Sequence, residues 1–337
     1  MVREASHQGP RRSGELRRVT RVGVIAPHAV ALHDLPAFAV DLADLGYTDF
    51  WAGESDRADG ITPLSIVAAS ETRLALGTAI VPVYTRGRAL LAQTAATLAS
   101  AAPGRVTMGL GASSPAIVEG WNNIPFVDPL TRVRDTVRYL RRALAGERVD
   151  GGFRLGLVPD PPPTLAIGAL QPQMLRLAGR EGDGVVLTSL GADDVAPLLE
   201  RVAPERPNYA VVAWVTVCVA EGRAETERAL AIARRRVGRY LLTPTYARYH
   251  RWLGRGDLLD EMGTNLDATP ERLIRDLVVV GSPDECRAQL EQFVRAGVTT
   301  LLYEVLPVSG PGSRTDLSTT LVPLSPSNFA ALRPTGK

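Results

Sequence analysis

Residues able to bind a ligand or carry a reaction occur in this sequence as short groups that directly follow apolar runs. The first groups are residues 27–28 (PH), 54–57 (ESDR) and 80–86 (IVPVYTR). Later groups are rich in small residues, at 109–114 (GLGASS), 168–171 (GALQ) and 188–191 (TSLG). General acids are scarce among them, and small residues let a flat molecule approach the backbone closely. This composition favours redox chemistry carried by a bound cofactor over hydrolysis by side chains.

Several kinds of chemistry are disfavoured because the residues they need are missing. The only lysine is Lys337, which argues against a Schiff base and against a P-loop. The four histidines form no HxH or HExxH pattern, so we predict no metal site. The two cysteines, Cys218 and Cys286, form no CxxC motif and no disulfide framework. That cysteine usage predicts a cytoplasmic protein.

The charge pattern bears on possible partners. The formal net charge is only +2 and the basic residues are dispersed, which argues against nucleic acid as a partner. No apolar run is long enough to span a membrane. Residues 1–20 combine Gly, Pro, Ser and Arg without apolar periodicity, which predicts a flexible basic arm. A targeting role for this arm is the less favoured alternative, because no apolar segment follows it.

Short apolar runs alternate with longer amphipathic segments along the rest of the chain. We expect eight strands, at residues 21–27, 48–54, 74–81, 105–111, 164–170, 184–190, 209–220 and 298–307. Nearly all are continuously apolar, as parallel strands buried on both faces are. Eight strand–helix alternations predict an α/β fold, a (β/α)8 TIM barrel, in a single domain at residues 21–330. A helical insertion between strands seven and eight, at about 234–280, is expected to cover one end of the barrel.

A barrel of this kind has its active site at the carboxyl ends of its strands, which brings the polar groups described above together. The GLGASS segment resembles GxGxxG, but Ser114 replaces the third glycine and the segment follows a fourth strand. We interpret it as a strand-to-loop turn and not as a dinucleotide site. Residues 168–171 lead into a helix, whose amino end can hold a phosphate without lysine. The alternative is an ordinary turn between strand and helix.

Three separated blocks of the sequence carry a family resemblance. They are residues 76–122 (LGTAIVPVYTRGRALLAQTAATLASAAPGRVTMGLGASSPAIVEGWN), 166–189 (AIGALQPQMLRLAGREGDGVVLTS) and 280–304 (VGSPDECRAQLEQFVRAGVTTLLYE). The chain resembles the bacterial luciferase-like superfamily, and within it the coenzyme F420-dependent oxidoreductases related to methylenetetrahydromethanopterin reductase. The resemblance extends over about residues 22–307. It implies a luciferase-like barrel, F420 as cofactor with FMN as the alternative, and a homodimer.

The resemblance also implies roles for individual residues. The third strand of this family ends in a bulge with a non-prolyl cis peptide bond, which would join Ala79 to Ile80 and place Ile80 behind the cofactor ring. Residues 168–171 correspond to the phosphate-binding turn. The residues that the resemblance places around the cofactor are Asp56, Thr78, Ala79, Ile80, Gly109, Gly111, Gly168, Ala169, Leu170 and Gln171.

Candidates for proton transfer and substrate binding come from the same end of the barrel and from the insertion. Glu54, Asp56 and His28 are the candidates for proton transfer, and for Glu54 the alternative is an ion pair with Arg57 or Arg86. The candidates for substrate contact are Arg57, Tyr84, Trp121, Tyr246 and His250. For Trp121 the favoured alternative is packing within its loop, and for Tyr246 and His250 it is packing within the helical insertion.

One departure from the family pattern bears on the reaction. Glucose-6-phosphate dehydrogenases of this family have Ser-Asp-His where this chain has Ser55-Asp56-Arg57, and the lysines that bind sugar phosphate have no counterpart here. We therefore favour a reductase that transfers hydride from reduced F420 to an activated C=C or C=N bond of a small molecule. The alternatives are an FMN-dependent monooxygenase and a barrel without catalytic activity that acts as a binding subunit.

Overall fold

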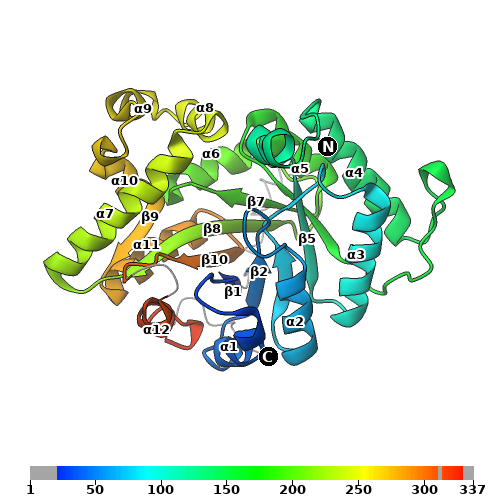
Figure 1. Cartoon of the computed structure of the whole chain (residues 1–337), viewed down its shortest axis with the longest axis horizontal. Coiled ribbons are helices and arrows are strands. Elements are labelled where there is room, and N and C mark those ends of the chain that lie inside the picture. The colour runs from blue at the N-terminus through cyan, green and yellow to red at the C-terminus, as the bar shows by residue number, and fades with distance from the viewer. Residues whose placement is uncertain (1–20, 310–312, 329–337) are drawn as a thin grey trace, which may run out of the picture.

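A closed barrel of parallel strands forms the centre of the molecule (Figure 1). The computed structural model describes residues 21–309 and 313–328, so the predicted arm at residues 1–20 lies outside the described part. β10 pairs with both β1 and β8, which closes the ring and confirms the predicted barrel. The barrel strands are β1 (Arg21–Ile25), β2 (Asp49–Ala52), β3 (Ala75–Thr78), β5 (Val106–Gly111), β6 (Thr164–Gly168), β7 (Gly184–Thr188), β8 (Ala210–Val219) and β10 (Thr300–Val305).

Amphipathic helices cover the outside of the barrel (Figure 1). They are α1 (Leu35–Asp44), α2 (Thr62–Ser70), α3 (Arg88–Ala101), α4 (Pro129–Leu144), α5 (Pro172–Glu181), α6 (Ala192–Val202), α11 (Pro283–Arg295) and α12 (Arg314–Leu321). Their apolar stripes are buried with the outward side chains of the strands in one large core cluster. Among the described residues, no helix has both the length and the apolar character needed to cross a membrane.

Side chains fill the inside of the barrel. Ile25, Trp51, Val212 and Leu302 meet there in a separate apolar cluster. The Trp51 ring lies against Gly77, where a Cβ atom would come within 2.4 Å of it. Because the interior is packed, a ligand can bind only at an open end, and we call the end at the carboxyl termini of the strands the mouth.

The segment between β8 and β10 forms a helical lobe at residues 222–281 on one side of the barrel (Figure 1). It contains α7 (Gly222–Leu241), α8 (Pro244–Trp252), α9 (Gly256–Met262) and α10 (Glu271–Leu277) and has its own apolar cluster. The prediction of helix to about residue 280 is wrong at its end, where β9 (Val278–Gly281) pairs with Thr216–Val219 of β8. β8 has ten residues and pairs with β7 only through Ala210–Trp214, so β9 takes the edge that β7 leaves open.

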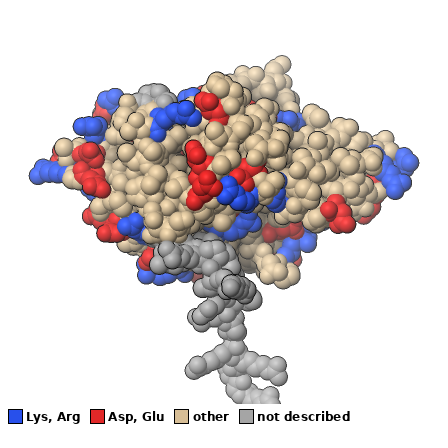
Figure 2. Space-filling view, turned by 90° about the horizontal axis from the view of Figure 1, so that it is seen from below, with Lys and Arg blue, Asp and Glu red and all other residues tan. Residues whose placement is uncertain are grey.

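Acidic and basic side chains lie side by side on the face shown in Figure 2, without a large area of one sign. Many of the arginines in the described part pair with carboxylates, for example Arg141 with Asp183 at 2.9 Å and Arg142 with Glu147 at 2.9 Å. Such exposed pairs contribute at most about 1 kcal/mol each. The stability of the barrel therefore depends mainly on its apolar core.

Candidate functional site at the barrel mouth

The third barrel strand is interrupted at the mouth. β3 ends at Thr78, the peptide bond between Ala79 and Ile80 is cis, and the chain then continues as β4 (Val81–Pro82). The Thr78 hydroxyl donates a hydrogen bond to the Gly109 carbonyl oxygen of β5 at 2.7 Å. This cis bond is the one that the family resemblance singles out. The interruption turns the Ile80 side chain toward the ends of β5 and β6.

Three glycines make room for this bulge. At Gly109 a Cβ atom would lie only 1.9 Å from the Thr78 carbonyl oxygen, so no side chain fits there. At Gly111 and Gly168 a Cβ atom would lie 2.9 Å from the Ile80 side chain. Ile80 thus lies over the ends of two neighbouring strands, and it is only partly buried. The result is a small apolar platform at the mouth, which suits a flat ring.

The turn after β6 leads directly into α5. The Ala169 amide donates to the Val186 carbonyl oxygen at 3.2 Å, and Gln171 is the residue before the helix. The Gln171 side chain does not cap α5, and its Nε2 contacts the Thr245 carbonyl oxygen at 3.5 Å. The first amides of α5 are therefore without a side-chain cap, which fits an anionic group there.

The polar residues 54–57 follow β2, and they differ in whether they are paired or exposed. Glu54 accepts from Arg86 Nη2 at 2.7 Å and from the Gly60 amide at 3.1 Å, so Arg86 is its partner and not Arg57. Asp56 and Arg57 are exposed, and among the described residues Asp56 accepts only from the Ser55 hydroxyl, at 3.1 Å. Glu54 is held within its loop, whereas Asp56 is accessible.

His28 follows β1 on the same side of the mouth. Partial burial and the nearby Arg57 guanidinium lower the pKa of its imidazole, and the Glu304 carboxylate opposes that shift. His28 is therefore a neutral imidazole near pH 7.

A polar cluster at the ends of β8 and β10 was missed in the sequence. Glu304 Oε1 pairs with Arg236 of α7, and Glu304 Oε2 accepts from Trp214 Nε1 at 3.1 Å and from the Thr216 hydroxyl at 3.3 Å. The Trp214 ring reaches toward β2, where a Cβ atom on Gly53 would lie 3.4 Å from it. Two-residue alternation could have revealed Glu304, because Leu302 points into the barrel and Glu304 is the next residue on that face.

The cluster combines a buried charge pair with tyrosine hydroxyls. The side chains of Arg236 and Glu304 are 28% and 16% exposed. Burial lowers the pKa of Arg236, but the Glu304 carboxylate outweighs this and the pKa is raised overall. Tyr240 lies one helical turn beyond Arg236, and its ring meets Tyr246 edge-on with centroids 5.3 Å apart. Burial and Glu304 raise the pKa of Tyr240, so its hydroxyl stays protonated.

Comparison with known proteins identifies the family. Residues 17–300 match the sequence model of the luciferase-like monooxygenase family. The chain belongs to the luciferase-like monooxygenase family. Its curated relatives include the 5,10-methylenetetrahydromethanopterin reductase of Methanolobus tindarius, at 24% identity over 76% of this chain and 85% of the relative. They also include the F420-dependent glucose-6-phosphate dehydrogenase of Beutenbergia cavernae, at 30% identity over 75% of this chain and 79% of the relative.

Solved structures agree on the fold of this luciferase-like protein. An F420-dependent secondary alcohol dehydrogenase in complex with an F420–acetone adduct superposes with a TM-score of 0.73 at 16% identity. The match covers 94% of this chain and 99% of the other. The named relatives, a reductase and a dehydrogenase, make the luciferase-like protein an oxidoreductase.

The other predicted substrate residues of this luciferase-like protein differ in accessibility. Tyr84 is buried, and its hydroxyl donates to the Val127 carbonyl oxygen at 2.5 Å, which ties down the loop after β5. Trp121 is 58% exposed, so the prediction that it packs within its loop is wrong. A single π-helical turn, Ala116–Trp121, buries Val118 and points the indole outward.

The two predicted substrate residues of the lobe are packed. Tyr246 is partly buried against Tyr240, and His250 is completely buried. His250 Nε2 lies 3.0 Å from the Ser189 hydroxyl at the end of β7. Burial, with a contribution from Arg255, lowers the pKa of His250 to about 3, so the imidazole is neutral. Packing is thus their main role in the structure, and a substrate contact for either stays a prediction.

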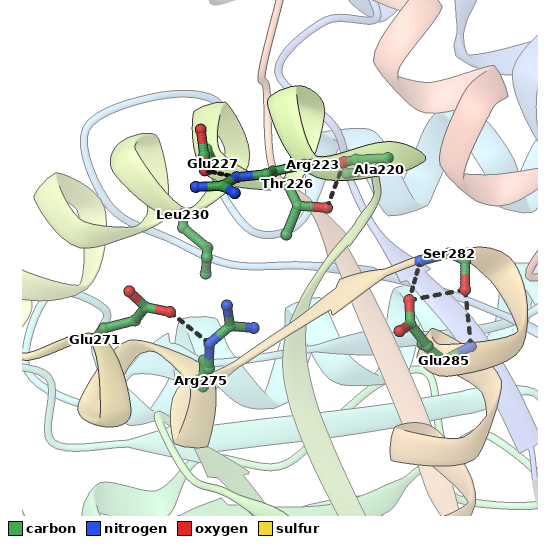
Figure 3. A pocket seen from close by; sticks show the side chains of 10 residues that line it. Ala220, Arg223, Thr226, Glu227, Leu230, Glu271, Arg275, Ser282 and Glu285 are labelled. Carbon is green, nitrogen blue, oxygen red and sulfur yellow. Dashed lines mark hydrogen bonds and ion pairs between the residues drawn. The ribbon is translucent and has the colours of Figure 1, made fainter.

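A surface pocket of about 490 Å³ lies between the starts of α7 and α11 and helix α10 (Figure 3). Its charged side chains pair with one another, Arg223 with Glu227 and Arg275 with Glu271, each at 2.7 Å. None of the predicted site residues lines it. Within residues 21–309 and 313–328, no cluster of His, Cys, Asp and Glu could hold a metal ion.

Proposed function

We propose that this oxidoreductase binds coenzyme F420 at the barrel mouth and reduces an activated C=C or C=N bond of a small molecule. The observation that supports this most is the apolar platform that Ile80 forms over Gly111 and Gly168, where the third barrel strand is interrupted. The uncapped start of α5 lies beside this platform, at the end of the strand that carries Gly168. Both sequence relatives are named for F420 or for the methanopterin reductase reaction.

The proposed roles follow from position and packing. Ile80, with Thr78, Ala79 and the backbone of Gly109 and Gly111, forms the wall behind the ring and leaves its other side open. The turn at residues 168–171 and the first amides of α5 hold the phosphate, and exposed Asp56 contacts the cofactor. When bound, reduced F420 supplies the hydride. The protein itself supplies orientation and exclusion of water.

Proton delivery is assigned to accessible groups of the mouth. Neutral His28 and exposed Asp56 can relay a proton from water to the reduced carbon. Glu54 is less suited, because Arg86 and the Gly60 amide occupy its carboxylate. Arg57 stands where glucose-6-phosphate dehydrogenases have histidine, and the described residues include no lysine, so a sugar phosphate is disfavoured as substrate. We also propose a cytoplasmic homodimer.

Titration of the purified protein with F420 and with FMN tests this function. We expect micromolar binding of F420, weak or no binding of FMN, and no substrate-dependent consumption of oxygen. Binding of FMN alone together with oxygen consumption would instead establish a flavin-dependent monooxygenase. Failure to bind either cofactor would leave a non-catalytic barrel.

A further inference from the structure

Arg236 presents unused hydrogen-bond donors at the mouth. Its Nη2 is paired with Glu304, but no described residue accepts from its Nε or Nη1. The side chain is 28% exposed, so a ligand that enters the mouth can reach these donors. A half-buried guanidinium with free donors is costly unless a ligand or water completes its hydrogen bonds.

The contacts of Glu304 show which way Arg236 faces. Glu304 follows inward-facing Leu302 on β10, and it accepts from Trp214, whose ring extends over the mouth toward Gly53, the residue after β2. Arg236 of α7 meets Glu304 from the lobe, so its guanidinium lies above the mouth. In the closed ring β10 lies between β1 and β8, whereas Ile80 lies over the ends of β5 and β6. Arg236 therefore faces the proposed cofactor platform from the opposite side of the mouth.

Glu304 is a positioning group and not a free acid. One carboxylate oxygen forms the ion pair with Arg236, and the other accepts hydrogen bonds from both Trp214 and Thr216. This three-sided attachment fixes the orientation of the guanidinium, so its remaining donors are already directed when a ligand arrives.

We propose that Arg236 binds a carboxylate of the substrate, with Glu304 as the residue that positions it. With Nη2 paired to Glu304, Arg236 keeps its Nε–H and Nη1–H donors for a carboxylate, whose charged oxygens accept more strongly than the oxygen of a neutral amide. The charged groups near this position, Arg57 and Asp56 as well as the Arg236–Glu304 pair, balance one another, so recognition depends on directed hydrogen bonds more than on net charge. The inference rests on the proposed function, because the carboxylate is that of the hydride acceptor.

Direct ligand binding tests this assignment without turnover. The probes are cinnamate, crotonate and sorbate, each compared with its primary amide, and isothermal titration calorimetry measures their binding. Binding is measured with the protein alone and again with F420 present. We expect at least one acid to bind about 10- to 100-fold more tightly than its amide, the range for a hydrogen bond to a charged group.

Variants of α7 provide the controls. Arg236→Met should abolish the preference for the acid, Arg236→Lys should keep part of it, and Glu304→Gln should weaken acid binding while amide binding stays the same. Arg239→Met makes the same change of charge at an exposed position of the same helix and should have no effect. Far-ultraviolet circular dichroism verifies that each variant is folded.

Three results would overturn the inference. They are equal affinity for acids and amides, no binding by any of the acids, and an Arg236→Met variant that behaves like Arg239→Met. Each is distinct from failure of the proposed function, which the F420 titration reports separately. A protein that binds F420 but shows no preference for acids would refute only the role of Arg236.

Discussion

Ile80 and Gly111 form the contact on which the proposed cofactor wall depends. A Cβ atom at Gly111 would lie 2.9 Å from the tip of the flexible Ile80 side chain, which can move aside. We therefore expect Gly111→Ala to fold with a loss of about 1–3 kcal/mol in unfolding free energy, but to bind F420 at least tenfold more weakly. Thermal unfolding and F420 titration measure the two effects. Gly87→Ala is the matched control, because nothing lies within 4 Å of its Cβ position. Unchanged F420 affinity in Gly111→Ala would refute the assignment of Ile80 as the wall.

At the residue scale, local motifs were easier to predict than pairs brought together by folding. The third-strand bulge and the turn at 168–171 are contiguous in sequence, so a family resemblance identifies them. The pair of Arg236 and Glu304 is separated by 68 positions and forms only because the barrel closes and α7 folds back over it. Glu304 is the one acid in β10. In the sequence, only the two-residue alternation of that strand indicates that its side chain points into the barrel.

At the scale of elements, the lobe and the barrel have separate apolar clusters, which makes their stabilities separable. Leu273 of α10 is fully buried in the lobe cluster, and Leu165 of β6 is buried in the barrel core. Leu273→Ala leaves a cavity, so it should lower the unfolding free energy of the lobe by about 2–5 kcal/mol and let the lobe open locally. Hydrogen exchange should then increase in α7, α10 and β9 but not in β1–β7. Leu165→Ala is the matched control and should raise exchange throughout. A uniform rise in Leu273→Ala would mean that lobe and barrel unfold as one unit.

The eight barrel strands were predictable because each is a continuous apolar run, as strands covered on both faces are. β9 was not predicted, because four residues directly after a helix give too little periodicity to separate strand from helix. Its Val-Val-Val run favours a strand, but the deciding factor is the free edge that the long β8 offers at Thr216–Val219. That edge exists only in the folded barrel, so the sequence pattern does not contain it.

At the scale of the whole molecule, closure of the barrel buries hydroxyl and thiol groups from distant parts of the chain. Tyr47 and Tyr303 meet edge-on with ring centroids 6.1 Å apart, and both are buried. Burial raises the pKa of both phenols well above their ordinary range. It also raises the pKa of the Cys218 and Cys286 thiols to about 12. The folded protein therefore holds protons that the unfolded chain releases at lower pH.

Stability should consequently fall as pH rises above about 9, where unfolded thiols begin to ionise, and fall further above about 10, where unfolded phenols do. Each such group lowers the unfolding free energy by up to about 1.4 kcal/mol for every further pH unit. The sequence has a single lysine, so lysine titration adds little in this range. Urea unfolding at a series of alkaline pH values measures the slope. Tyr303→Phe is the most informative variant. Its hydroxyl has no hydrogen-bond partner among the described residues, so the substitution removes no hydrogen bond. It should reduce the slope above pH 10 by about one proton, and an unchanged slope in Tyr303→Phe would contradict the burial of this phenol.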